Sequence, residues 1–156
     1  MKIVGFESGN GLRLGIIEGD SVIDLQAADP RVPVDLGEWL AANNGDLKPL
    51  AEIAKRAPAS ARRPLAGLKY ALPVARPGKI ICLGLNYFEH AKEGGHAKPE
   101  YPSIFMRCLT SLAPHEAPLI RPIVSETFDY EAELVAIIGR RGRHIKAADA
   151  LPYVAA

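Results

Sequence analysis

Proline places the strongest constraint on how this chain can fold. Between residues 58 and 78 there are four prolines, at Pro58, Pro64, Pro73 and Pro77. Because proline lacks a backbone amide donor and clashes with the preceding helical turn, neither a helix nor a central strand runs through such a stretch. We therefore predict a connector here, with an N-terminal subdomain over residues 1–70 and a second domain over residues 71–156.

The N-terminal region has patterns of both strands and helices. Residues 2–25 alternate apolar and polar positions between glycines, which predicts a small antiparallel meander. Asp35 followed by Glu38 is typical of a capped helix start, and a second helix is predicted over residues 47–57.

The second region has further strand patterns, with less helix. Its predicted strands cover residues 79–84, 103–107 and 133–139, and the first is expected to be buried. Short helices are predicted over residues 87–93 and from Ala147 onward. The fold class is therefore α+β.

Composition excludes several broad functions. A net charge of +1 over 156 residues argues against binding nucleic acid or an anionic membrane through charge alone. The N-terminus lacks an apolar signal core, and no apolar run approaches the roughly 20 residues of a membrane span. Cys82 and Cys108 are too few for a disulfide framework. A cytoplasmic location is expected.

Glu131 and Glu133 are the first candidate site residues. On a strand, residues two apart project from the same face, and the apolar residues that follow predict burial of both faces. Two neighbouring, partly desolvated carboxylates repel each other unless a cation relieves them, and Mg²⁺ prefers oxygen ligands. A strand that begins outside the core, with both glutamates hydrated, fits the spacing equally well.

His90 and Glu93 are the second candidate pair. They are three residues apart, so on a helix they share one side. A carboxylate beside an imidazole can orient it and raise its basicity, which suits general-base activation of water. On spacing alone, a surface helix with an incidental pair of these residues is the more economical interpretation.

Taken together, these segments resemble the fumarylacetoacetate hydrolase family. The resemblance rests on four stretches in the family's order, across about half of the chain: KIICLGLNYFEHAKE (79–93), PSIFMR (102–107), PLIRP (118–122) and DYEAELVAIIGRRGRHI (129–145). It implies that the second region is part of the family's mixed β-roll. The first 70 residues resemble the variable N-terminal subdomain of such proteins less diagnostically.

The resemblance also implies roles for individual residues. Glu131 and Glu133 look like two of three carboxylate ligands of Mg²⁺ or Mn²⁺, and His90 and Glu93 look like the acid–base pair that activates water. Arg107 stands where many members have a substrate-binding lysine. The substrate-binding positions implied by the family pattern are Asn86, Tyr87 and Arg107.

The implied reaction is metal-dependent hydrolysis of a carbon–carbon bond in an acylpyruvate-like or fumarylacetoacetate-like diketo acid, by a homodimer. Isomerisation or decarboxylation within the same family is the nearest alternative. The family's third carboxylate follows the point where PYVAA stands here. The chain is therefore expected to be the N-terminal half of a family member, which leaves a catalytically incompetent fragment as another alternative.

Overall fold

The computed structural model describes residues 1–9, 11–97 and 99–156. The chain forms two compact units, of which the larger joins Met1–Ala75 to Ala113–Ala156 and the smaller is Arg76–Leu112. Both antiparallel sheets and short helices are present, so the α+β prediction is confirmed. Among the described residues, no helix combines the length and apolarity needed to cross a bilayer.

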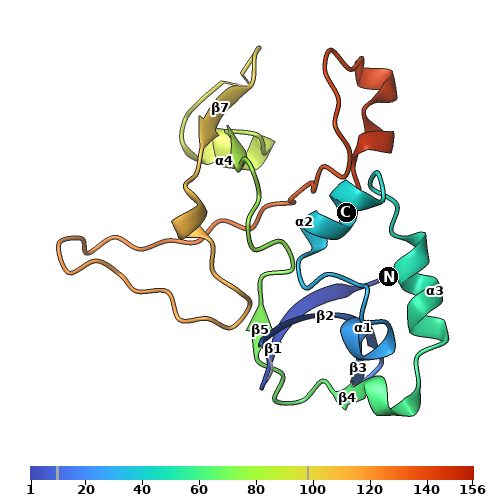
Figure 1. Ribbon diagram of the computed structural model, residues 1–156. Coiled ribbons are helices and arrows are strands. Elements are labelled where there is room, and N and C mark those ends of the chain that lie inside the picture. Colours follow the sequence, from blue (N-terminus) through green and yellow to red (C-terminus); the bar gives the residue numbers. More distant parts are fainter. Residues whose placement is uncertain (10, 98) are drawn as a thin grey trace. The chain divides into compact units, whose positions relative to one another are not determined.

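The predicted meander forms the centre of a five-stranded sheet in the larger unit (Figure 1). Its strands are β1 (Ile3–Ser8), β2 (Gly11–Glu18) and β3 (Ser21–Asp24), all antiparallel to their neighbours. The β2–β3 turn passes through Gly19 at φ +57°, a left-handed conformation that glycine adopts without steric cost. This prediction succeeded because the alternation continues through all three strands.

The proline-rich connector contributes both outer strands of this sheet. β4 (Arg62–Pro64) pairs with β3, and β5 (Tyr70–Ala71) pairs with β1, giving the order β4-β3-β2-β1-β5. The predicted connector therefore also carries two short edge strands, which the sequence pattern did not identify. Proline is compatible with an edge strand, where one row of amides has no ladder partner, and strands this short leave no readable alternation.

Four short helical elements follow or flank the sheet: α1 (Leu25–Ala28), α2 (Leu36–Ala42), α3 (Lys48–Lys55) and the 3₁₀ turn η1 (Ala59–Ala61). The predicted Asp35 cap is present, since its Oδ1 accepts hydrogen bonds from the amides of Gly37 at 2.7 Å and Glu38 at 3.3 Å. Helix α3 is shorter than predicted at both ends.

The main core of the larger unit lies between these helices and one face of the sheet. It is built from the apolar positions that the sequence patterns selected: Leu14, Ile16, Ile23, Leu25, Val32, Leu36, Trp39, Leu40, Leu50 and Ala54. A second, smaller cluster of Val4, Phe6 and Val22 is packed by Leu65, Leu68 and Tyr70. The helices thus pack against one face of the sheet, and the connector covers part of the other.

The smaller unit is a hairpin of two strands with a helix between them in sequence. β6 (Ile81–Gly84) pairs with β7 (Ser103–Met106), and α4 (Phe88–Glu93) lies in the segment that joins them. The predicted elements are present, but the expected burial of β6 is wrong, because Ile81 is 56% exposed and Leu83 is 39% exposed. A two-stranded hairpin offers too little cover for an apolar strand.

The C-terminal part of the larger unit departs most from prediction. Over residues 133–139, which are all described, the only strand-like pairing is an isolated bridge between Ile138 and Val154. The expected helix from Ala147 is replaced by two 3₁₀ turns, η3 (Ala147–Asp149) and η4 (Leu151–Tyr153). Pro152 explains why the helix does not form, because it cannot donate the amide hydrogen bond that a continuous α-helix would require there.

Candidate functional site

In the smaller unit, a strained turn leads from β6 into α4. Gly84 ends β6, and Leu85 then adopts φ +53°, in the left-handed region. That conformation costs a side chain of this kind roughly 1–2 kcal/mol. Asn86 follows, and Tyr87 is the N-cap residue of α4, in an extended conformation. The turn thus places the Asn86–Tyr87 motif between the end of a strand and the start of a helix.

Helix α4 places His90 and Glu93 on one side, as their spacing predicted. Both side chains are exposed, whereas Ala91 is only 2% exposed and marks the inner side of the helix. Glu89 and Lys92 form a loose ion pair at 3.9 Å along the same helix. An imidazole and a carboxylate one turn apart, both accessible to a ligand, are suited to moving protons to and from a bound water.

Arg107 lies at the other end of the hairpin from Asn86. Its amide donates to the carbonyl of Ile80 at 3.1 Å, directly before β6, whereas Gly84 pairs with Ser103 at the far end. Four residues of strand separate these two pairs, which is about 13 Å at the usual rise. The hairpin therefore does not bring the backbones of Arg107 and Asn86 together, although the Arg107 side chain is exposed.

Glu131 and Glu133 belong to the larger unit, where both are exposed. The strand that was to hold them on one face is not formed, so that expectation is wrong for this structure. Burial of both faces of a strand requires neighbouring elements, and Leu134 and Val135 remain 91% and 74% exposed. Whether the two glutamates bind a metal stays a prediction.

The donor chemistry of this pair fits a hard cation. Two carboxylates separated by one residue supply oxygen ligands of the type that Mg²⁺ and Mn²⁺ take. The described residues contain no group of three or more His, Cys, Asp or Glu side chains arranged to hold a metal ion. Glu131 and Glu133 can therefore provide part of a coordination shell and leave its remaining positions to other oxygen donors.

The smaller unit also contains a cavity of about 480 Å³ next to the motif. Leu83 and Leu85 line it from the strand and turn, Phe88 and Ala91 from α4, and Tyr101 from the segment before β7. Sequence reasoning assigned no role to Phe88 or Tyr101. The only available signal was the proximity of these aromatic residues to the motif, because the cavity is lined jointly by residues 99–102 and by α4.

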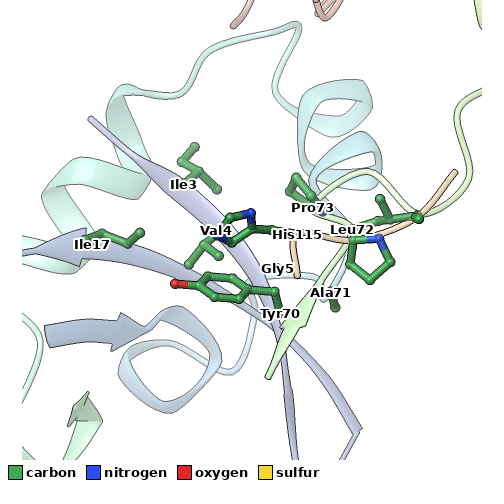
Figure 2. Close-up of a pocket in the computed structure, with 11 residues that line it drawn as sticks. Ile3, Val4, Gly5, Ile17, Tyr70, Ala71, Leu72, Pro73 and His115 are labelled. Atoms are coloured by element: carbon green, nitrogen blue, oxygen red, sulfur yellow. The ribbon is translucent and has the colours of Figure 1, made fainter. Parts of the chain in front are cut away.

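A second cavity, of about 360 Å³, lies in the larger unit at the β5 edge of the sheet (Figure 2). His115 packs edge-on against Tyr70, with ring centroids 4.8 Å apart and an interplanar angle of 75°. Figure 2 shows His115 beside Val4 and above the Tyr70 ring. The remaining lining is almost entirely apolar, so this cavity lacks the convergent acidic groups of a metal or proton-transfer site.

The clearest electrostatic perturbation lies away from these residues, at the end of α1. Asp29 accepts hydrogen bonds from the Arg31 side chain at 2.9 and 2.7 Å and from its amide at 3.0 Å. These bonds lower the pKa of Asp29 from its ordinary value of 3.8 to about 2. The pair orders the loop after α1 and has no part in the candidate site.

Solved structures with the same arrangement of elements define the class. A protein from Mycobacterium smegmatis matches 98% of this chain with a TM-score of 0.75 and 28% identity. A fumarylacetoacetate hydrolase from psychrophilic Exiguobacterium antarcticum matches 99% with a TM-score of 0.71 and 26% identity. The chain covers 52% of each of those proteins. Its fold is therefore that of the fumarylacetoacetate hydrolase proteins.

Sequence comparison shows the family directly. The family model described as Fumarylacetoacetate (FAA) hydrolase C-terminal matches residues 79–156, which include all the candidate site residues. A fumarylacetoacetate hydrolase domain-containing protein 2 homolog of Dictyostelium discoideum is 37% identical over 92% of the chain, and the mitochondrial oxaloacetate tautomerase FAHD2A of Homo sapiens is 34% identical over 97%. The chain belongs to the fumarylacetoacetate hydrolase family. It spans about half the length of these relatives, 47% and 45% respectively.

Proposed function

We propose that this chain contributes to a site that hydrolyses a carbon–carbon bond in a small acylpyruvate-like diketo acid. The observation that carries the proposal is the exposed His90–Glu93 pair on α4, directly after the Leu85 turn and within the segment matched by the family model. Membership of an enzyme family and the accessibility of this pair support a catalytic role.

Each candidate residue has a chemical task in this proposal. His90 accepts a proton from the attacking water, and Glu93 stabilises the imidazolium that results. Arg107 offers a planar, permanently charged guanidinium to a substrate carboxylate. Asn86 and Tyr87 contribute hydrogen-bonding groups to the bound oxo acid.

Glu131 and Glu133 would hold a divalent cation, Mg²⁺ or Mn²⁺, through their carboxylate oxygens. When bound, such a cation orients the oxygens of an oxo acid and stabilises negative charge that develops on them. Both glutamates are exposed and can reach a ligand from solvent.

Keto–enol tautomerisation of a small 2-oxo dicarboxylic acid is a second candidate. It is favoured by the relatives named oxaloacetate tautomerase, which are 34–35% identical over nearly the whole chain. The same residues suffice for it, because a tautomerase needs a group that removes a proton from carbon and returns it to oxygen, but no attacking water.

Parallel assays separate the two reactions. With Mg²⁺ present, we expect acylpyruvate cleavage that falls about 10²–10⁴-fold in His90→Ala and Glu93→Gln, as for loss of a general base, while Glu89→Gln on the same helix leaves it unchanged. Loss of oxaloacetate enol–keto conversion in the same variants, without any acylpyruvate cleavage by the unmodified chain, would establish the second candidate. Absence of both activities would identify this chain as incompetent on its own.

The assembly and location expected from the sequence remain part of the proposal. We propose a homodimer that acts on a small oxo acid in the cytoplasm. Several relatives are named as mitochondrial proteins, so fractionation of cells that express the chain is the direct test of its location.

A further inference from the structure

The C-terminal segment that follows Glu131 and Glu133 pairs with the last residues of the chain. Ile137 donates its amide to the carbonyl of Ala156 at 2.6 Å, and Ala155 donates to the carbonyl of Ile137 at 2.8 Å. Gly139 donates to the carbonyl of Tyr153 at 2.8 Å. These bonds make a short antiparallel ladder, and Ile137 and Ala155 pack from it onto the main core of the larger unit.

Two glycines make this attachment possible. Gly45 follows α2 in a left-handed conformation, at φ +80°, and a Cβ atom there would lie 3.0 Å from the Gly139 carbonyl group. A Cβ atom on Gly139, which is buried, would lie 2.7 Å from the Cβ of Ala155 and 3.0 Å from the Cα of Gly45. Backbone meets backbone at this point, so a larger residue at either position forces the two segments apart.

We infer that the contact between Gly45 and Gly139 positions Glu131 and Glu133, by tying the segment that carries them to the N-terminal subdomain. Glu133 lies four residues before Ile137, so it stays within about 14 Å of the attachment even when the chain is fully extended. This inference rests on the proposed role of the two glutamates in holding a divalent cation.

The attachment also limits how far the carboxylates can move, because the chain is held by backbone hydrogen bonds only four residues after Glu133. The N-terminal subdomain, which carries none of the candidate site residues, thereby becomes part of the machinery that presents them.

Titration with Mn²⁺ tests the inference without any catalytic assay. The measured quantities are the Mn²⁺ affinity and the paramagnetic broadening of the amide signals of residues 131–134. In Gly139→Ala we expect the affinity to fall about ten-fold, equivalent to roughly 1.4 kcal/mol. Gly78→Ala is the matched control, because a Cβ there meets nothing within 4 Å, and its affinity should equal that of the unmodified chain.

A rescue variant distinguishes displacement of the segment from general damage. Gly139→Ala combined with Ala155→Gly removes the closest clash, so part of the lost affinity should return. Should Gly139→Ala fail to fold, as judged by Trp39 fluorescence, Ile137→Val is the milder substitute, with an expected loss of about two-fold. Unchanged Mn²⁺ affinity in a folded Gly139→Ala variant, or in Ile137→Val when that substitute is needed, overturns the inference.

Two further variants separate this inference from the proposed function. If Glu131→Gln and Glu133→Gln leave Mn²⁺ binding intact, the proposed metal pair is wrong and the inference falls with it. If both weaken binding while Gly139→Ala does not, the metal pair stands and only the positioning role is lost. Weakening in all three supports both.

Discussion

Asp24 shows how a single residue can link the sheet to its edge. Its side chain is fully buried, and its Oδ1 caps α1 by accepting from the amide of Ala27 at 3.0 Å. Its Oδ2 lies 3.0 Å from the Arg63 guanidinium, but it makes no well-aligned hydrogen bond among the described residues. Arg63 on β4 is thus the charge partner of a buried carboxylate on β3, and its attraction joins the connector to the meander.

Replacing Arg63 should therefore destabilise the larger unit. In Arg63→Met we expect the free energy of unfolding to fall by about 2 kcal/mol, because a buried carboxylate loses its counter-charge. Urea denaturation followed by Trp39 fluorescence measures the change. Arg62→Met is the control. Arg62 pairs with Glu18 at 3.1 Å, and both side chains are exposed. Such surface pairs contribute about 0–1 kcal/mol. Equal effects from the two substitutions would contradict the argument.

At the scale of elements, α2 is where the sequence pattern and the structure agree most closely. Asp35 was recognised as its cap, and the structure adds a second task that spacing could not reveal. Its Oδ2 accepts from the amide of Ala75 at 2.7 Å, forty residues away, and the amide of Leu36 donates to the carbonyl of Pro73 at 2.8 Å. The start of α2 therefore also holds the end of the connector.

Substitutions at Asp35 separate the two tasks. Asp35→Ala should lower the free energy of unfolding by about 2 kcal/mol, since it removes a helix cap and the acceptor for Ala75. Asp35→Asn should cost roughly half as much, because Oδ1 can still cap α2 while an amide nitrogen cannot accept from Ala75. Thermal unfolding measured by circular dichroism tests the order. A loss in Asp35→Asn as large as in Asp35→Ala would place the whole effect in the contact with Ala75.

At the scale of the whole molecule, the chain exposes many large apolar side chains. Leu119, Ile120, Ile123 and Val124 are between 68% and 98% exposed in the larger unit. Burial of these side chains against another molecule would remove apolar surface from water and is therefore favourable. In the smaller unit, the two-stranded sheet of β6 and β7 also has outer edges with unpaired backbone groups among the described residues. Both features favour association.

We therefore expect the 156-residue chain to self-associate as its concentration rises. Sedimentation velocity should show the average mass increasing across a concentration series. Replacing Ile123 and Val124 together with lysine should shift the association to higher concentration, because charge at an apolar contact must be desolvated. The control is replacement of the exposed pair Arg141 and Arg143 with lysine, which keeps the charge. A monomer at every concentration would contradict the expectation.

The candidate site shows where sequence reasoning was sufficient and where it was not. The helix that carries His90 and Glu93 forms as predicted, because its residue spacing and the glycine that ends it, Gly94, are local properties. The strand expected for Glu131 and Glu133 does not form. A buried strand needs partner strands and covering elements, and the residue pattern does not show whether these are present. For the aromatic residues of the cavity beside α4, the only local signal was their proximity to the motif.

The sequence by itself determined the meander, the capped helix, the strand–turn–helix motif and the family, since each depends on residue types at short, fixed spacings. Only the tertiary structure decided that the proline-rich connector supplies both edges of the sheet. It also decided that Gly45 and Gly139 meet across more than ninety intervening residues. The physical reason is that strand pairing and close packing each involve two segments that are distant in the sequence. The residue pattern of one segment does not show which other segment it will contact.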